Sequence, residues 1–119
     1  MRHLLSIGDL TAKEVERLFH WAADAKASLK RGQPGAALPG RSLALVFEKP
    51  SLRTRVTFQV AMSQLGGQAV YLSAQEIQLG VRESVADVAR NLGRWVDAIA
   101  ARTYAHSTVQ ELAQWAGPR

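Results

Sequence analysis

Residues 42–55 read Ser-Leu-Ala-Leu-Val-Phe-Glu-Lys-Pro-Ser-Leu-Arg-Thr-Arg. The first six form a continuous apolar run, which is typical of a strand buried on both faces of a parallel sheet. Pro50 ends the run, because proline has no backbone N–H to donate and disfavours helix at the residue before it. Apolar side chains then recur at helical spacing from residue 53 to 65. The stretch therefore predicts a strand, a turn and a helix.

The same kinds of signal extend this unit in both directions. Thr11 with Glu14, and Ser84 with Asp87, form capping-box patterns that mark helix starts. A polar stretch at 73–82 separates two of the elements. The predicted helices are at 12–30, at 53–65, from 85 onward and after a cap at Ser107; the predicted strands are at 42–47, 69–72 and 98–101. This alternation predicts an α/β fold, a three-layer sandwich with a parallel sheet flanked by helices.

The composition excludes several kinds of chemistry. The 119 residues suit one domain, and the absence of cysteine rules out disulfides, thiolate nucleophiles and cysteine-bound zinc. His3, His20 and His106 are far apart in the sequence, so we expect no metal site. No apolar run approaches membrane-spanning length and no signal-peptide pattern is present, which favours a cytoplasmic location and no membrane partner.

The net charge of +5 needs an explanation. It is compatible with nucleic acid, with a small anionic ligand or with a solvated basic surface. No basic stripe interleaved with aromatic residues is present, which argues against nucleic acid. The arrangement of the arginines decides between the other two.

The turn at 51–55 favours a small anion. It lies where a strand ends and a helix begins, so free N–H groups and the helix dipole favour negative charge there. Ser51 and Thr54 add hydroxyl donors, and Arg53 and Arg55 add forked guanidinium groups. The turn has neither the P-loop pattern nor the glycines of a dinucleotide fingerprint. The alternative is that Ser51 only caps the helix and the arginines are surface charge.

A family resemblance sharpens this interpretation. Residues 47–58 resemble the carbamoyl-phosphate signature of the aspartate/ornithine carbamoyltransferases, usually Ser-Thr-Arg-Thr-Arg, and the preceding Phe-Glu-Lys is similar to the ornithine branch. Further motifs match in order and spacing at 65–67, 78–84, 87–90 and 98–102. The resemblance covers nearly the whole chain.

The resemblance implies roles for individual residues. Ser51, Arg53 and Thr54 match positions that hold the phosphate of carbamoyl phosphate, and Thr54 also reaches toward its carbonyl oxygen. Arg102 matches an arginine that bridges phosphate and carbonyl oxygen, so Arg53, Thr54 and Arg102 are the expected catalytic residues. Leu52 stands where the signature has threonine, and its backbone N–H can still donate.

Two further positions match family residues with other roles. Gln78 matches a polar residue that reaches the carbamoyl phosphate of a neighbouring subunit. Arg55 matches a second signature arginine with a structural role, for which Glu48 or Glu83 is a possible partner.

The implied reaction is transfer of a carbamoyl group from carbamoyl phosphate to L-ornithine, giving L-citrulline and phosphate, without any cofactor. The resemblance makes residues 1–119 a carbamoyl-phosphate-binding domain that is incomplete at its C-terminal end. It also implies that the amino-acid-binding domain is missing, that this piece alone is inactive, and that the full-length protein is a homotrimer or a multiple of it. Two alternatives stay open: a carbamoyltransferase for aspartate or a modified ornithine, and a non-catalytic anion-binding or oligomerisation module.

Overall fold

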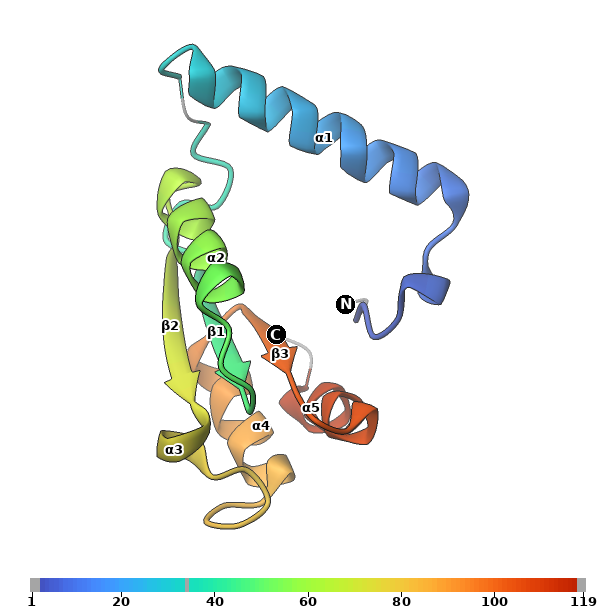
Figure 1. Cartoon of the computed structure of the whole chain (residues 1–119), viewed down its shortest axis with the longest axis vertical. Helices are drawn as coiled ribbons and strands as arrows, with labels where there is room; N and C mark the ends of the chain where they lie inside the picture. The colour runs from blue at the N-terminus through green and yellow to red at the C-terminus, as the bar shows by residue number, and fades with distance from the viewer. Residues whose placement is uncertain (1–2, 34, 118–119) are drawn as a thin grey trace.

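The fold is seen in a computed structural model, which describes residues 3–33 and 35–117. Three parallel strands alternate with helices, and the helix α1 runs apart from them (Figure 1). The elements are the 3-10 helix η1 (Ile7–Asp9), α1 (Ala12–Lys30), β1 (Ser42–Phe47), α2 (Leu52–Gln64), β2 (Gln68–Ser73), α3 (Ala74–Ile77), α4 (Val85–Trp95), β3 (Ala98–Arg102) and α5 (His106–Ala116).

The sheet has the order β2-β1-β3, with β1 parallel to both neighbours. The apolar run in β1 therefore occupies the central strand, which is buried from Leu43 to Phe47. In register, Phe47 lies beside Ser73 on one side and Arg102 on the other. This pairing brings three strand ends to one edge of the sheet and confirms the predicted fold class.

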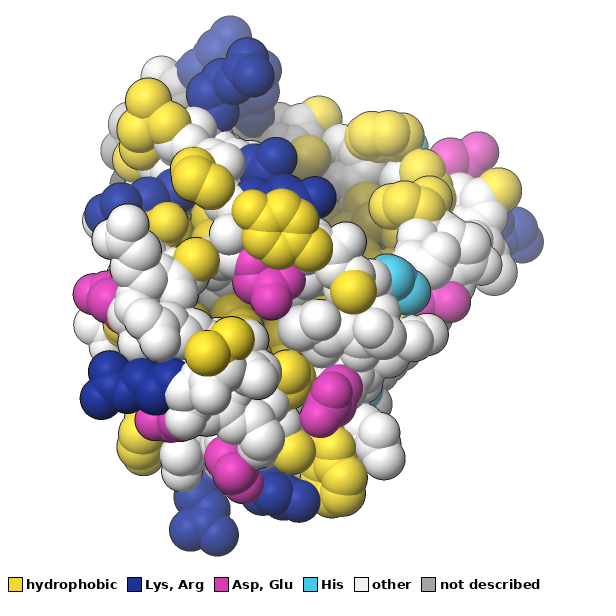
Figure 2. All heavy atoms as spheres, turned by 60° about the horizontal axis from the view of Figure 1, so that its bottom comes forward, with side chains coloured by type: hydrophobic (Ala, Val, Ile, Leu, Met, Phe, Trp, Pro, Cys, Tyr) yellow, Lys and Arg dark blue, Asp and Glu magenta, His cyan; other side chains and the backbone are white. Residues whose placement is uncertain are grey.

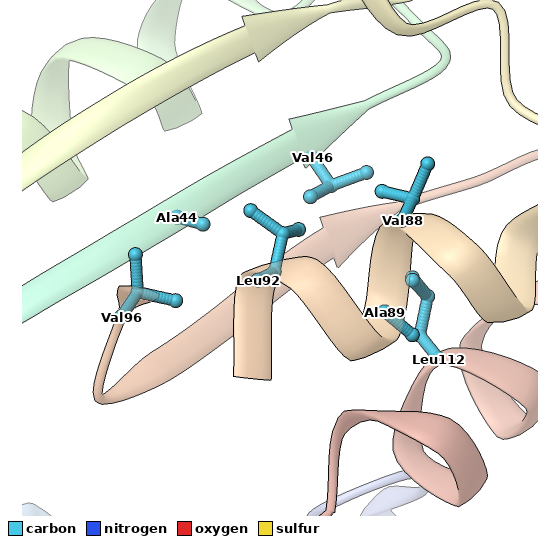
Figure 3. Close-up of a cluster of buried hydrophobic side chains, with 7 residues drawn as sticks. All are labelled: Ala44, Val46, Val88, Ala89, Leu92, Val96 and Leu112. Atoms are coloured by element: carbon cyan, nitrogen blue, oxygen red, sulfur yellow. The ribbon is translucent and has the colours of Figure 1, made fainter. Parts of the chain in front are cut away.

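Alternate side chains of β1 pack into two different cores. Ala44 and Val46 face α4 and α5, where they join Val88, Leu92 and Leu112 (Figure 3). The β1 side chains on the opposite face, Leu43, Leu45 and Phe47, form the second cluster together with Met62 of α2. Burying an aliphatic side chain contributes about 1.5–3 kcal/mol, so this one strand anchors both layers of the sandwich.

The first helix forms as predicted, from Ala12 to Lys30, behind a capping box made by Thr11 and Glu14. None of its residues is buried, and Phe19 and Trp21 are 71% and 58% exposed. The helical spacing of apolar residues therefore predicted this helix correctly. Its apolar side chains nevertheless join neither core of this chain.

Two local details differ from the sequence-based expectation. The last helix begins at His106 with Ala105 as its N-cap, so Ser107 lies inside the first turn and the prediction that it caps the helix is wrong. The polar stretch at 73–82 contains the short helix α3, capped by Ser73 and Glu76, which was not predicted. Four residues are too few for a helical period to show in the sequence.

Asp97 ties the start of β1 to the start of β3. Its Oδ2 accepts the Ser42 backbone N–H at 2.8 Å and the Ser42 hydroxyl at 3.0 Å, and its Oδ1 accepts from Arg41 at 2.8 Å. The Ser42 N–H, then Arg41 and then the Ser42 hydroxyl lower the pKa of Asp97 from 3.8 to about 2.

This pKa predicts an acid-dependent stability. A carboxyl whose pKa falls on folding stabilises the fold above its unfolded pKa and loses that contribution as the pH falls through its folded pKa. Asp97→Asn should therefore lower the urea midpoint relative to the parent at pH 6, and the difference should be much smaller at pH 2, where about half of the folded carboxyl is protonated. Asp24→Asn, on exposed α1, is the matched control and should differ from the parent at neither pH. An equal deficit of Asp97→Asn at both values would contradict an ionic role.

Candidate functional site

The candidate site lies at the sheet edge where the strands end. Because all three strands are parallel, their carboxyl ends share this edge, which is where ligands bind in open α/β sheets. Viewed toward this end of the molecule, basic side chains form separate groups with acidic and apolar side chains between them (Figure 2). The positive charge on this face is therefore divided into local groups and does not form a continuous stripe.

The first turn of α2 is built to receive negative charge. Ser51 is the N-cap, but its hydroxyl accepts no backbone N–H; it donates to Thr54 Oγ1 at 2.9 Å. The first turn carries no acidic residue. By contrast, α1 and α4 begin with a hydroxyl that accepts a backbone N–H and with an acid in the first turn. The free N–H groups of α2 and the positive end of its dipole can therefore receive an external anion. Because α5 also begins without a cap or a first-turn acid, the choice of α2 rests on its hydroxyls and arginines as well.

Arg102 joins this turn from the neighbouring strand. It is the last residue of β3, and its Nη1 donates to the Pro50 carbonyl at 3.3 Å. Arg102 and Thr54 line the same cavity of about 620 Å³, which continues along β3. The structure thus brings Ser51, Thr54 and Arg102 together, although they are up to 51 positions apart in the sequence.

The two arginines of the turn have different environments. Arg53 is exposed, and within residues 3–33 and 35–117 no side chain forms a hydrogen bond or ion pair with it. Arg55 instead stacks on Tyr71, with its Cζ 4.0 Å from the ring centroid, and its Nε donates to Gln59 at 3.4 Å. Arg53 is thus available to a ligand, although it does not line the cavity of Thr54 and Arg102, while Arg55 is engaged by the protein.

The charge of Arg55 acts on Glu76, whereas the sequence left Glu48 and Glu83 as its possible partners. The Ser73 backbone N–H and then the Ser73 hydroxyl lower the pKa of Glu76, and the charge of Arg55 lowers it further. Arg55 therefore connects the first turn of α2 to Tyr71 of β2, and Glu76 feels its charge without a direct contact between them being seen.

Gln78 lies on a different cavity. Its backbone adopts the left-handed conformation, with φ of 44°. Gln78 lines a cavity of about 450 Å³ together with Glu48, Ile77 and Tyr104. The cavity of Thr54 and Arg102 does not include Gln78. Leu52 is 77% exposed and contributes an apolar side chain beside the turn.

One residue at this edge was not singled out as a site residue from the sequence. The Glu48 carboxylate accepts the Tyr104 backbone N–H at 2.7 Å and so joins the segments that follow β1 and β3. Its sequence signals are its position directly after the buried strand and its place in the Phe-Glu-Lys stretch that is similar to the ornithine branch.

Metal-ligand clusters and membrane-spanning helices are both absent from the described ranges. Residues 3–33 and 35–117 hold no group of three or more His, Cys, Asp or Glu side chains arranged to bind a metal ion. Within the same ranges, none of the helices combines the length and apolar character needed to cross a membrane.

Comparisons with known proteins agree on one family. Residues 2–119 match the family model described as "Aspartate/ornithine carbamoyltransferase, carbamoyl-P binding domain". An ornithine carbamoyltransferase from Pyrococcus horikoshii is 50% identical over 115 residues, which is 97% of this chain and 36% of that protein. The chain thus spans about 36% of the length of this curated relative.

Solved structures show the same relationship. An ornithine carbamoyltransferase from Pyrococcus furiosus superposes with a TM-score of 0.92 at 49% identity, covering 96% of this chain and 36% of that one. The catalytic subunit of an aspartate transcarbamoylase from M. jannaschii gives a TM-score of 0.86 at 28% identity, covering 97% of this chain and 38% of that one. The fold is shared by both branches, while the sequence is more similar to the ornithine proteins.

Proposed function

Because this chain belongs to the aspartate/ornithine carbamoyltransferase family, as a carbamoyl-phosphate-binding domain, we propose that the whole protein transfers the carbamoyl group of carbamoyl phosphate to L-ornithine. The products are L-citrulline and phosphate. Residues 1–119 supply the site for carbamoyl phosphate, and the ornithine site belongs to a second domain outside this chain. The higher identity to ornithine carbamoyltransferases than to the aspartate enzyme supports ornithine as the acceptor.

The observation that carries the proposal is the first turn of α2, which lacks a side-chain cap and a first-turn acid and faces Arg102. In our assignment, the phosphate is held by the free N–H groups of this turn, by the Ser51 hydroxyl and by Arg53. Thr54 and Arg102 share one cavity, so both can reach the phosphate and the carbonyl oxygen of the same ligand.

The proposed chemistry is a carbamoyl transfer governed by position and charge. The neutral side-chain amine of ornithine attacks the carbamoyl carbon, a C–N bond forms, and the bond from that carbon to the phosphate oxygen breaks. The proton lost by the amine leaves with phosphate. Arg102 and Thr54 stabilise the negative charge that develops on the carbonyl oxygen, and Arg53 stabilises the departing phosphate.

We also propose that this protein is a homotrimer that acts in the cytoplasm, in the biosynthesis of arginine. In this assembly Gln78, which lines a cavity other than that of Thr54 and Arg102, serves the ligand of a neighbouring subunit. A residue that serves a neighbouring subunit's ligand need not reach its own. Sedimentation of the full-length protein tests the oligomeric state.

Binding of inorganic phosphate by the 119-residue chain tests the site directly. In an NMR titration, the amides of residues 51–54 should shift first. Arg53→Ala should weaken binding roughly tenfold to a hundredfold, because a hydrogen bond to a charged group contributes about 1.5–3 kcal/mol. Arg31→Ala, at the end of α1, removes the same charge and should leave the affinity unchanged. Largest shifts elsewhere, or equal losses in both variants, would show that the turn is an ordinary helix start with surface charge.

A further inference from the structure

The backbone N–H and the side-chain carboxylate of Glu48 both bond to the segment at the end of β3. Its backbone N–H donates to the Arg102 carbonyl at 2.8 Å, one residue beyond the ladder that joins the two strands. Its side-chain Oε2 accepts the Tyr104 backbone N–H at 2.7 Å. Glu48 therefore grips the two residues on either side of Thr103.

Two weaker contacts complete this junction. Arg102 Nη1 donates to the Pro50 carbonyl at 3.3 Å, and the Lys49 ammonium lies 4.7 Å from the centroid of the Tyr104 ring. The short distance and the charge of the acceptor make the bond from Tyr104 to Glu48 the strongest side-chain contact of the set. Arg102 itself is exposed, so packing does little to hold its position.

We propose that Glu48 is a positioning residue for the carbamoyl-phosphate site: its carboxylate holds the turn after β3 so that the Arg102 guanidinium faces Ser51 and Thr54. The inference rests on the proposed function, since it assigns Glu48 a role through a residue that contacts the substrate. The side chain of Glu48 accepts the Tyr104 N–H and so keeps one loop in place.

The acceptor role predicts which substitutions preserve activity. In the full-length protein, Glu48→Gln keeps an oxygen that can accept the Tyr104 N–H and should retain kcat/KM for carbamoyl phosphate within about threefold. Glu48→Met has a similar size but no such oxygen, and should lose about tenfold or more, because misplacement of a reacting group by about 1 Å costs up to about a hundredfold. Glu16→Met, on exposed α1, removes the same charge and should match the parent.

A double-mutant cycle separates positioning through Arg102 from a general structural effect. If Glu48 acts through Arg102, then Glu48→Met should cost little further activity in an Arg102→Ala background. Additive losses, or failure of Glu48→Gln to preserve activity, would overturn the inference. Glu48→Ala serves in the same cycle if the methionine variant does not fold. An inactive parent would instead count against the proposed function. In that case, hydrogen exchange of the Tyr104 amide tests the bond to Glu48 by itself. Slower exchange in the parent than in Glu48→Met would support the positioning role of Glu48, and equal exchange would overturn it.

Discussion

Replacing Arg102 with alanine in the full-length protein should slow carbamoyl transfer by a factor on the order of 100 or more, the usual cost of losing one donor to a developing oxyanion. The structure explains why one residue should matter so much. Arg102 ends β3 directly beside the central strand and donates to Pro50, one residue before the turn that begins α2. No other arginine or lysine lines its cavity with Thr54 in the described ranges.

The measurement is kcat/KM for carbamoyl phosphate, with circular dichroism to check the fold. Arg102→Lys keeps the charge but loses the forked geometry, so it should restore only part of the activity. Arg31→Ala removes an arginine far from the strand ends and should leave turnover unchanged. Near-normal kinetics in Arg102→Ala would return this residue to the role of a surface arginine at the end of a strand.

The largest expected effect on stability is at Gly93, where α4 meets α5. A Cβ added at Gly93 would collide with the Ala116 carbonyl oxygen and would lie 3.1 Å from Ala116 Cα. These are backbone atoms, which cannot turn aside as the end of a flexible side chain can. Gly93→Ala should therefore destabilise the fold by about 3 kcal/mol, at the upper end of the range for overpacking, and lower Tm by on the order of 10 °C.

Whether Gly93→Ala lowers or raises the free energy of unfolding distinguishes a collision with α5 from an unhindered helix position. In an unhindered helix interior, glycine to alanine stabilises by about 1 kcal/mol, because alanine is the better helix former. Asn91→Ala is the matched control: it lies on the exposed side of the same helix and should be neutral or slightly stabilising. Urea unfolding of both variants measures the difference. A Gly93→Ala variant as stable as the parent would show that α5 ends farther from α4 than the structure places it.

Much of the fold was readable from local sequence signals. The bounds of the first helix and of the central strand were predicted to the residue, and the next helix and strand to within one residue. In these segments the capping box at Thr11, the apolar run and the helical spacing of apolar residues all act over a few residues. The prediction failed where local signals were weak or in competition, as in the four residues of α3 and at Ser107, which has the chemistry of a cap but lies in the first turn of a helix that starts without one.

The candidate site divides in the same way. The sequence alone placed Ser51, Arg53 and Thr54 at the start of a helix after a strand, because all of the evidence lies within the turn. Tertiary structure decided that β1 lies between β2 and β3, and this order places Arg102 beside Pro50. Tertiary structure also stacks Arg55 on Tyr71 and lets the Glu48 carboxylate accept the backbone N–H of Tyr104, 56 positions away. Contacts of this kind depend on which strands become neighbours. The choice of neighbours is set by the free energy of the whole core. The apolar side chains on both faces of β1 are removed from water only when other elements cover both faces.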